Sequence, residues 1–310
     1  MDRHVSVLLN EAIDGLNIKP DGIYVDMTLG RGGHSSEILK RLNKNGLLIS
    51  FDLDRTAIDE SVERLNAIGD NFKIIHDNFV NIKERLLELG ISDVDGVLMD
   101  LGASSPQFDD TERGFSYRGS AKLDMRMNVE QKLTAMEIVN TYSLNDLTKI
   151  FREYGEEKFA YQIAREIVRA RDIKPIELTS ELVDIIKLAK PAKELAKKGH
   201  PAKQIFQALR IEVNDELNNL TKALNDSMAM LKHGGRLVVI TFHSLEDRIV
   251  KQTFKSVSII EGTRHGIIAL PNEEETKFSV ASNKPILPSD EELEFNHRSK
   301  SAKMRILIRK

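Results

Sequence analysis

Four short apolar segments, each followed by polar residues, constrain the fold of this chain most. They lie at residues 23–27, 47–51, 72–76 and 94–100, and helical patterns separate them. Segments of this length and composition are typical of buried strands. Strands that alternate with helices predict an α/β fold with a doubly wound sheet. Because ligands bind past the carboxyl ends of strands in such sheets, the polar residues after each segment are candidate site residues.

The first strand leads through a glycine-rich turn into a helix. Glycines at Gly30, Gly32 and Gly33 let the backbone approach a ligand closely, and a helix N-terminus offers unpaired N–H groups. Their spacing departs from GxGxxG, so the turn alone is weak evidence for a dinucleotide. Asp52 ends the second strand 20 residues after Gly32, about the distance at which a carboxylate reaches ribose hydroxyls. Together these residues predict a site for a nucleotide-type cofactor.

Two residues near these strand ends have both a functional and a structural interpretation. Phe79 follows the third strand and could stack on an adenine ring, but a core position at a helix start explains it equally well. Asp52 could cap a helix, although Asp54 is better placed to cap the helix that starts near Arg55.

The fourth strand ends in Asp100, and a loop of small residues, 102–106, follows it. An acid and a loop of this kind can hold the polar edge of a substrate, although an ordinary strand-to-loop turn is the alternative. His243 lies at the equivalent position after a strand predicted at 236–241. A structural role is the more common interpretation of a lone histidine.

Residues 108–201 contain no convincing strand pattern, and apolar residues recur there at helical spacing. We therefore expect an all-helical insertion at residues 108–212. The sheet domain is expected to be discontinuous and to consist of residues 1–107 and 213–310.

Two further elements are expected after the insertion. Apolar residues in steps of three and four predict one long helix from His200 through Leu231, ended by Gly234. Residues 304–308 predict a final strand of the sheet, whereas 258–300 are polar and irregular.

Charge and cysteine content limit the chemistry. The net charge is −3, so a surface for nucleic acid must be local. One candidate is the segment from Lys187 to Arg210, which has one acid, Glu194, and seven basic residues, although a solvated helix face is the alternative. The seven are Lys187, Lys190, Lys193, Lys197, Lys198, Lys203 and Arg210.

The chain has no cysteine, so no thiolate can act as a nucleophile or ligate zinc. The sequence has no run of 18 apolar residues and no signal-peptide pattern, which predicts a cytoplasmic protein.

Several long motifs together resemble the bacterial small-subunit ribosomal RNA methyltransferase H family (MraW-like). They include MTLGRGGHS, VDGVLMDLGASSPQFD, HPAKQIFQALRIEVNDEL and FHSLEDRIVK, and the similarity spans nearly the whole chain. Met27 and Ala103 depart slightly from the family pattern. The segment 258–295 shows no strong similarity.

The resemblance implies a Rossmann-like class I methyltransferase sheet with a helical insertion that recognises RNA. It implies S-adenosylmethionine as methyl donor and no metal. The acceptor would be the exocyclic 4-amino group of one cytidine in the decoding region of 16S rRNA, within the small ribosomal subunit. Carried onto this sequence, the donor contacts would be Gly32, Gly33, His34, Asp52, Phe79, Asp100 and Gln107.

Asp100 and Ser105 are the candidate catalytic residues. A carboxylate or hydroxyl that accepts a hydrogen bond from the acceptor amine would localise its lone pair, and the same group could take the released proton. Ser104 or a loop carbonyl are alternatives to Ser105.

Three other functions remain open on the residues alone. They are a nicotinamide-dependent oxidoreductase, a methyltransferase for DNA or a small molecule, and a non-enzymatic RNA-binding assembly factor. The imperfect glycine spacing argues against the first, and the basic insertion argues against a small substrate. The sequence does not determine the oligomeric state.

Overall fold

The computed structural model describes residues 6–102, 111–258 and 276–310. The chain forms two compact units. The sheet unit consists of Met1–Gly102 and Leu217–Lys310, and the helical unit consists of Ala103–Glu216. Among the described residues, no helix is both long enough and apolar enough to cross a membrane.

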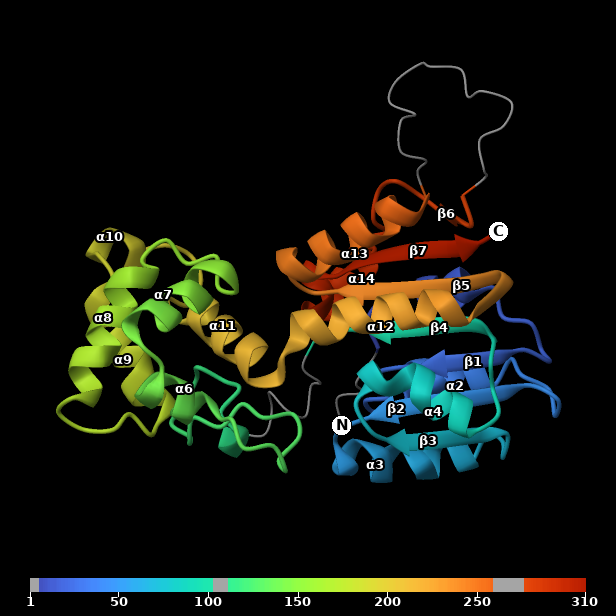
Figure 1. The fold of residues 1–310 in the computed structure, drawn as a ribbon, viewed down its shortest axis with the longest axis horizontal. Coiled ribbons are helices and arrows are strands. Elements are labelled where there is room, and N and C mark those ends of the chain that lie inside the picture. The colour runs from blue at the N-terminus through green and yellow to red at the C-terminus, as the bar shows by residue number, and fades with distance from the viewer. Residues whose placement is uncertain (1–5, 103–110, 259–275) are drawn as a thin grey trace, which may run out of the picture. The chain divides into compact units, whose positions relative to one another are not determined.

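A seven-stranded sheet organises the sheet unit, with the strand order β3-β2-β1-β4-β5-β7-β6 (Figure 1). The first five strands are parallel, and β7 runs antiparallel between β5 and β6. The four strands expected at the start of the chain are present, and the α/β fold with a Rossmann-like sheet is confirmed. The strands are β1 (Ile23–Asp26), β2 (Leu47–Asp52), β3 (Phe72–His76), β4 (Val94–Asp100), β5 (Leu231–Thr241), β6 (Phe278–Val280) and β7 (Lys303–Arg309).

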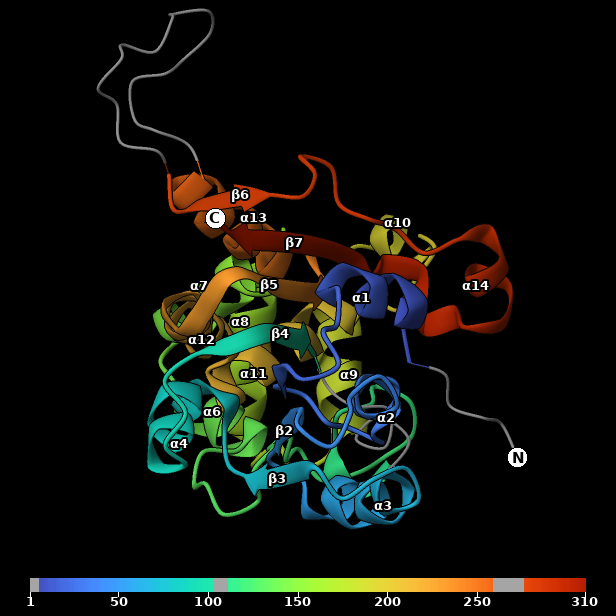
Figure 2. The ribbon, with the colours of Figure 1, turned by 90° about the vertical axis from the view of Figure 1, so that its right-hand side faces the viewer.

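Helices cover both faces of the sheet, because successive strand side chains point to opposite faces. In β4, Val97 and Met99 join the core beneath α4, α12 and α13, whereas Leu98 joins the core beneath α1, α2 and α3. Figure 2 shows the second group of helices together on one side of the sheet. The helices are α1 (Leu9–Leu16), α2 (Gly33–Leu39), α3 (Arg55–Asn66), α4 (Ile82–Glu88), α12 (Glu216–Met230), α13 (Ser244–Ser258) and α14 (Asp290–Phe295).

The prediction of one continuous helix from His200 to Leu231 is wrong. The structure has two helices, α11 (Lys203–Asn214) and α12, because Asp215 adopts the left-handed conformation (φ 49°) and ends α11. Aspartate is among the side chains that tolerate this conformation best. Gly234 does not end a helix either, since β5 already begins at Leu231 and Gly234 (φ 77°) lies within its first residues.

The end of the chain is more regular than the sequence suggests. The strand expected at 304–308 is confirmed as β7. Its partner β6 and the helix α14 lie in the segment that had appeared irregular. Strand β6 is only three residues long, which is too short for a period-2 pattern to be recognised.

The helical unit has a core of its own, built from apolar residues of its helices. Its described residues contain no strand, only an isolated bridge between Lys122 and Leu178. The helices are α6 (Ala135–Thr141), α7 (Leu144–Glu153), α8 (Ala160–Arg171), α9 (Thr179–Ala189), α10 (Ala192–Leu195) and α11.

A buried ion pair lies at the edge of this core. The Lys190 ammonium is 2.6 Å from the Glu157 carboxylate, and the two side chains are 8% and 2% exposed. Lys190 also donates to the carbonyl of Pro201 (2.7 Å), and Glu157 accepts from the backbone N–H of Phe159 (3.0 Å). Lys190 therefore has a structural role, and its charge is already compensated.

Replacement of Lys190 by methionine should destabilise the helical unit by about 3–5 kcal/mol, because the Glu157 carboxylate would remain buried without its partner. Urea unfolding monitored by circular dichroism measures this change. Glu157→Gln in the same chain should restore part of the loss. Lys193→Met, at an exposed position of the same segment, is the control and should change stability by less than about 0.5 kcal/mol. Equal losses for Lys190→Met and Lys193→Met would contradict this role of the pair.

Candidate active site

The glycine turn after β1 has a backbone that other residues adopt poorly. Gly30 and Gly32 have φ angles of 51° and 72°. A side chain at Gly33 would overlap the hydroxyl of Ser6. The three glycines therefore let the turn pack close to its neighbours.

A buried carboxylate, Asp26, holds this turn at the end of β1. It accepts the backbone N–H of Thr28 (3.1 Å) and the hydroxyl of Ser35 (2.6 Å), which lies 2.8 Å from the hydroxyl of Ser50. Asp26, Ser35 and Ser50 are completely buried. The sequence does not predict this network, and its one indication there is that an acid ends a buried strand.

Asp52 lies at the end of β2, where the sequence predicts a ribose-binding acid. Its two carboxylate oxygens accept the backbone N–H groups of Gly30 and Asp54, each at 2.8 Å. Burial raises the pKa of Asp52 to about 6. The two hydrogen bonds lower the pKa, because they favour the charged form, but burial has the larger effect. A carboxylate has about four acceptor positions, so Asp52 can still receive ligand hydroxyls. The cap of α3 is Asp54, as expected.

Phe79 begins a short 3₁₀ helix (Phe79–Asn81) after β3. It packs, partly buried, against the core beneath α4 and α12. The structure thus places Phe79 in a packing role, and contact with an adenine ring stays a prediction.

His34 and Asp100 approach each other from α2 and β4. His34 Nε2 is 3.1 Å from the carbonyl oxygen of Val7, and its Nδ1 is 3.6 Å from Asp100 Oδ2. Burial lowers the pKa of His34, which favours the neutral ring. The Val7 carbonyl can only accept a hydrogen bond, which places the ring proton on Nε2. Nδ1 then faces Asp100 as an acceptor, an arrangement that suits a protonated carboxyl group.

Asp100 has an unusual environment for a carboxylate. Its backbone N–H donates to the Thr28 hydroxyl (2.7 Å), which fixes the end of β4 beside β1. Burial, followed by repulsion from Asp26, Glu246 and Glu292, raises the pKa of Asp100 well above its usual value. Asp100 Oδ1 is buried and has no hydrogen-bond partner within the described part of the chain. Such an atom is rare in a protein and is well suited to receive a donor from a ligand.

Two predicted site residues, Ser105 and Gln107, lie outside the described residues. Their proposed roles stay predictions. The same holds for Ser104.

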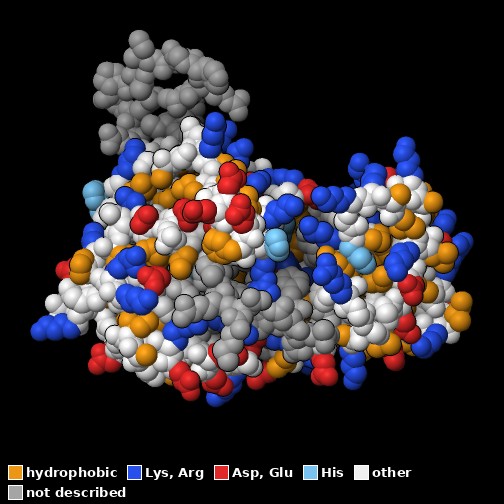
Figure 3. Space-filling model, turned by 180° about the vertical axis from the view of Figure 1, so that it is seen from behind, with side chains coloured by type: hydrophobic (Ala, Val, Ile, Leu, Met, Phe, Trp, Pro, Cys, Tyr) orange, Lys and Arg blue, Asp and Glu red, His pale blue; other side chains and the backbone are white. Residues whose placement is uncertain are grey.

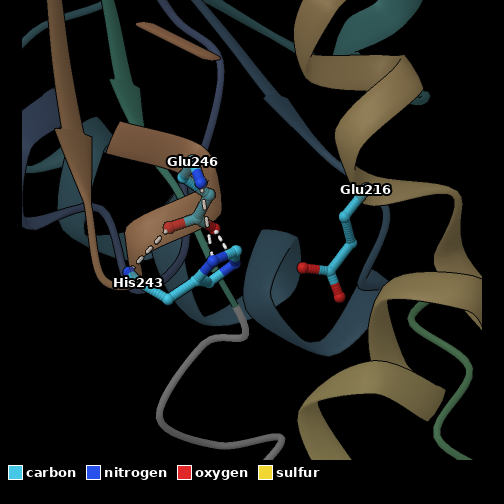
Figure 4. Close-up of side chains that lie close together, drawn as sticks. All are labelled: Glu216, His243 and Glu246. Atoms are coloured by element: carbon cyan, nitrogen blue, oxygen red, sulfur yellow. Dashed lines mark hydrogen bonds and ion pairs between the residues drawn. The ribbon is translucent and has the colours of Figure 1, made fainter. Parts of the chain in front are cut away.

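His243 follows β5 and lies beside Glu246 of α13 (Figure 4). Glu246 is 2% exposed, and its Oε2 accepts the backbone N–H groups of Phe242 (2.8 Å) and His243 (3.2 Å). His243 Nε2 lies 3.0 Å from Glu246 Oε1, but without the geometry of a hydrogen bond. The third side chain in Figure 4, Glu216, pairs within the helical unit with Arg210 at 2.8 Å.

The basic segment of the helical unit is less available than its sequence suggests. Figure 3 shows Lys and Arg side chains on the surface of this unit, with Asp and Glu side chains among them. Lys193, Lys198 and Lys203 are exposed. The other four basic residues form the ion pairs Lys187–Asp184, Lys190–Glu157, Lys197–Glu194 and Arg210–Glu216.

A stacked aromatic pair accompanies these charges. The rings of Tyr117 and His200 are 4.3 Å apart and nearly parallel, at 12°. Phe206 packs edge-on against Tyr117, with ring centroids 5.8 Å apart. Arg118 and Lys187 are near enough to His200 that, after burial, they lower its pKa further.

The strand order, with antiparallel β7, and the acids at the ends of β1, β2 and β4 define a class I methyltransferase. The glycine turn and the remaining acceptor positions of Asp52 fit the methyl donor S-adenosylmethionine. The chain belongs to the MraW methylase family, which matches residues 1–310. It is therefore a methyltransferase that uses S-adenosylmethionine.

Solved structures similar to this chain include a putative rRNA methylase from Clostridium thermocellum. It is 12% identical, with 99% of this chain and 100% of that one covered and a TM-score of 0.47. An rRNA methylase from Streptococcus thermophilus is 11% identical, with 99% of each chain covered and a TM-score of 0.45. A putative methyltransferase from Streptococcus mutans, in complex with SAH, is 11% identical, with 99% and 100% covered and a TM-score of 0.45.

Binding of the demethylated product, S-adenosylhomocysteine, should depend on pH through Asp52. We expect the ionised carboxylate, which forms above a pKa of about 6, to be the form that accepts two ribose hydroxyls. Affinity should therefore rise about tenfold per pH unit up to about pH 6 and be constant above it. Isothermal titration calorimetry between pH 5 and 8 measures this. Asp52→Asn should bind weakly at all pH values, and the same pH dependence in that variant would contradict the assignment.

Proposed function

We propose that this protein methylates the exocyclic 4-amino group of one cytidine in the decoding region of 16S rRNA, within the small ribosomal subunit. The observation that carries the proposal is the buried Asp100 Oδ1 atom, which has no hydrogen-bond partner in the described part of the chain. It lies at the carboxyl end of a central strand, where an open α/β sheet binds its ligands. Family membership supplies the methyl donor.

S-adenosylmethionine supplies a methyl group that its positively charged sulfur already activates. The task of the protein is thus to hold the acceptor in line with the departing sulfur. Gly32, Gly33 and His34 at the start of α2, together with Asp52, would hold the donor. Phe79, Asp100 and Gln107 would complete its contacts, as in the family that the sequence resembles.

Asp100 has the properties that an amine acceptor requires. The lone pair of a cytidine amine is delocalised into the ring, which makes the amine a poor nucleophile. A hydrogen bond from the amine to Asp100 Oδ1 would localise that lone pair. The raised pKa of Asp100 then favours transfer of the released proton to the carboxylate. Ser105 would position the same amine.

The helical unit supplies features suited to RNA. The exposed Lys193, Lys198 and Lys203 can contact phosphates. The Tyr117–His200 stack offers aromatic surface of the kind on which unpaired bases stack. The target base must leave any stack for its amine to reach the donor, which favours an accessible single strand.

The proposed function can be tested with isotopically methyl-labelled S-adenosylmethionine. The purified protein is incubated with unmodified small subunits, with free 16S rRNA or with DNA, and the digested nucleosides are analysed by mass spectrometry. Label in 4-amino-methylated cytidine from the subunit is the expected result. Label only in DNA or in another nucleoside would overturn the proposed substrate.

Asp100→Asn should lower turnover by about 10²- to 10⁴-fold, because the amide can accept a hydrogen bond but cannot take a proton. Wild-type turnover should rise with pH as Asp100 ionises, at a pH above the usual aspartate value of about 3.9. The variant should lack this rise. Single-turnover rates measure both effects.

Asp93→Asn is the matched control, since Asp93 is exposed and lies just before β4, at the opposite end of the strand. Its activity and pH profile should equal those of the wild type. Unchanged activity of Asp100→Asn would remove Asp100 from the mechanism.

A further inference from the structure

Two buried side-chain atoms lack a hydrogen-bond partner in the described part of the chain. They are Asp100 Oδ1 and His243 Nε2. Buried polar atoms of folded proteins almost always have partners, so each exception needs an explanation. Both atoms lie in one region of the sheet unit, which suggests that they have the same explanation.

The two residues lie at the ends of neighbouring strands. Asp100 is the last residue of β4, and His243 comes two residues after the end of β5. Asp100 pairs in register with Ile240 in β5, three residues before His243. The backbone N–H of Leu101 donates to the carbonyl of Ile240 (3.0 Å), so the pairing continues past the end of β4. A side chain at Gly102 would lie 3.6 Å from the ring of Phe242. The segments that carry Asp100 and His243 are therefore in contact.

Glu246 fixes how His243 presents its ring. The backbone N–H of Glu246 points at His243 Nδ1 from 3.5 Å, which assigns Nδ1 as acceptor and places the proton on Nε2. Glu246 Oε2 holds the backbone of His243. Glu246 is also one of the acids that repel the Asp100 carboxylate, together with Asp26 and Glu292. The Nε2–H group of His243 is thus carried by the segment that adjoins Asp100, and it lies 3.0 Å from Glu246 Oε1.

We propose that Asp100 Oδ1 and His243 Nε2 together bind the hydrogen-bonding edge of the acceptor cytosine. Asp100 accepts from the 4-amino group, and the Nε2–H group of His243 donates to the adjacent ring nitrogen N3. The assignment rests on the proposed function and gives His243 a role in base selection. These two groups form the Asp100–His243 pair.

The pair selects among bases by the order of donor and acceptor. Cytosine presents an amine donor beside a ring-nitrogen acceptor and matches it. Uracil and guanine present an oxygen acceptor beside an N–H donor, so both contacts would become mismatched. Adenine has the same order as cytosine, and its larger ring must be excluded by other contacts.

The test uses the full-length protein and RNA oligonucleotides with the target cytidine or with 3-deazacytidine, which lacks the N3 acceptor. Binding is measured in the presence of S-adenosylhomocysteine, and methyl transfer is measured as kcat and KM. For wild-type protein, loss of N3 should weaken binding about tenfold, or about 1.4 kcal/mol. His243→Ala should weaken binding of the cytidine RNA by a similar factor. The variant should bind the two RNAs equally.

The proposal would be overturned if the two decreases in affinity were independent. In that case the His243→Ala variant would bind the 3-deaza RNA about a hundredfold more weakly than the wild type binds the cytidine RNA. Equal binding of both RNAs by the wild type would also overturn the proposal. His243→Gln, which retains an N–H donor, should recover part of the affinity, and this recovery separates hydrogen bonding from a loss of folding. His233→Ala, at an exposed histidine near the start of β5, is the control and should behave as the wild type.

A second readout separates this proposal from the proposed function. Histidine ring signals of ¹⁵N-labelled protein are followed by NMR while cytidine or uridine monophosphate is added. The His243 signal should shift with cytidine monophosphate and not with uridine monophosphate. A selective shift without methylation of the RNA would support the Asp100–His243 pair and contradict the proposed function. Methylated cytidine together with equal shifts for both nucleotides would support the proposed function and contradict the Asp100–His243 pair.

Discussion

The hydrogen bonds of the buried Asp26 carboxylate support the rest of the site. Asp26 ties the turn after β1 to α2 through Thr28 and Ser35, and Ser35 in turn contacts Ser50 of β2. The Thr28 hydroxyl then accepts the backbone N–H of Asp100. One carboxylate therefore links three neighbouring strand ends. The glycine turn and the Asp100 backbone are both fixed relative to it.

This arrangement explains why the site can be rich in acids. Asp26, Asp52, Asp100 and Glu246 all lie at or just after strand ends of one sheet. Backbone N–H groups compensate part of their charge, since Asp52 and Glu246 each accept two of them. Asp100 is the exception, and burial among the others favours its protonated form.

Much of this architecture was accessible from the sequence, because four strands and their polar ends follow simple periodicity. Asp52, Asp100 and the three glycines could be chosen as candidate site residues because they lie at or just after strand ends. Ligands bind at this edge of an open α/β sheet. The break at Asp215 could not be predicted, since the apolar spacing continues through it and only the local backbone conformation interrupts the helix. The Asp26 network depends on side chains from β1, α2 and β2 that only the folded chain brings together. Charge compensation of the basic segment depends on partners such as Glu157, which lies 33 residues from Lys190.

The acids at the ends of β1, β2 and β4 have a consequence for turnover. The methyl donor carries a positive charge on sulfur, whereas the product formed from it is neutral at that atom. An acidic environment attracts the first and has no such attraction for the second. Transfer of the methyl group would therefore remove part of the electrostatic attraction between the ligand and the site. The acids at the strand ends would in this way favour departure of the spent donor and entry of a fresh one.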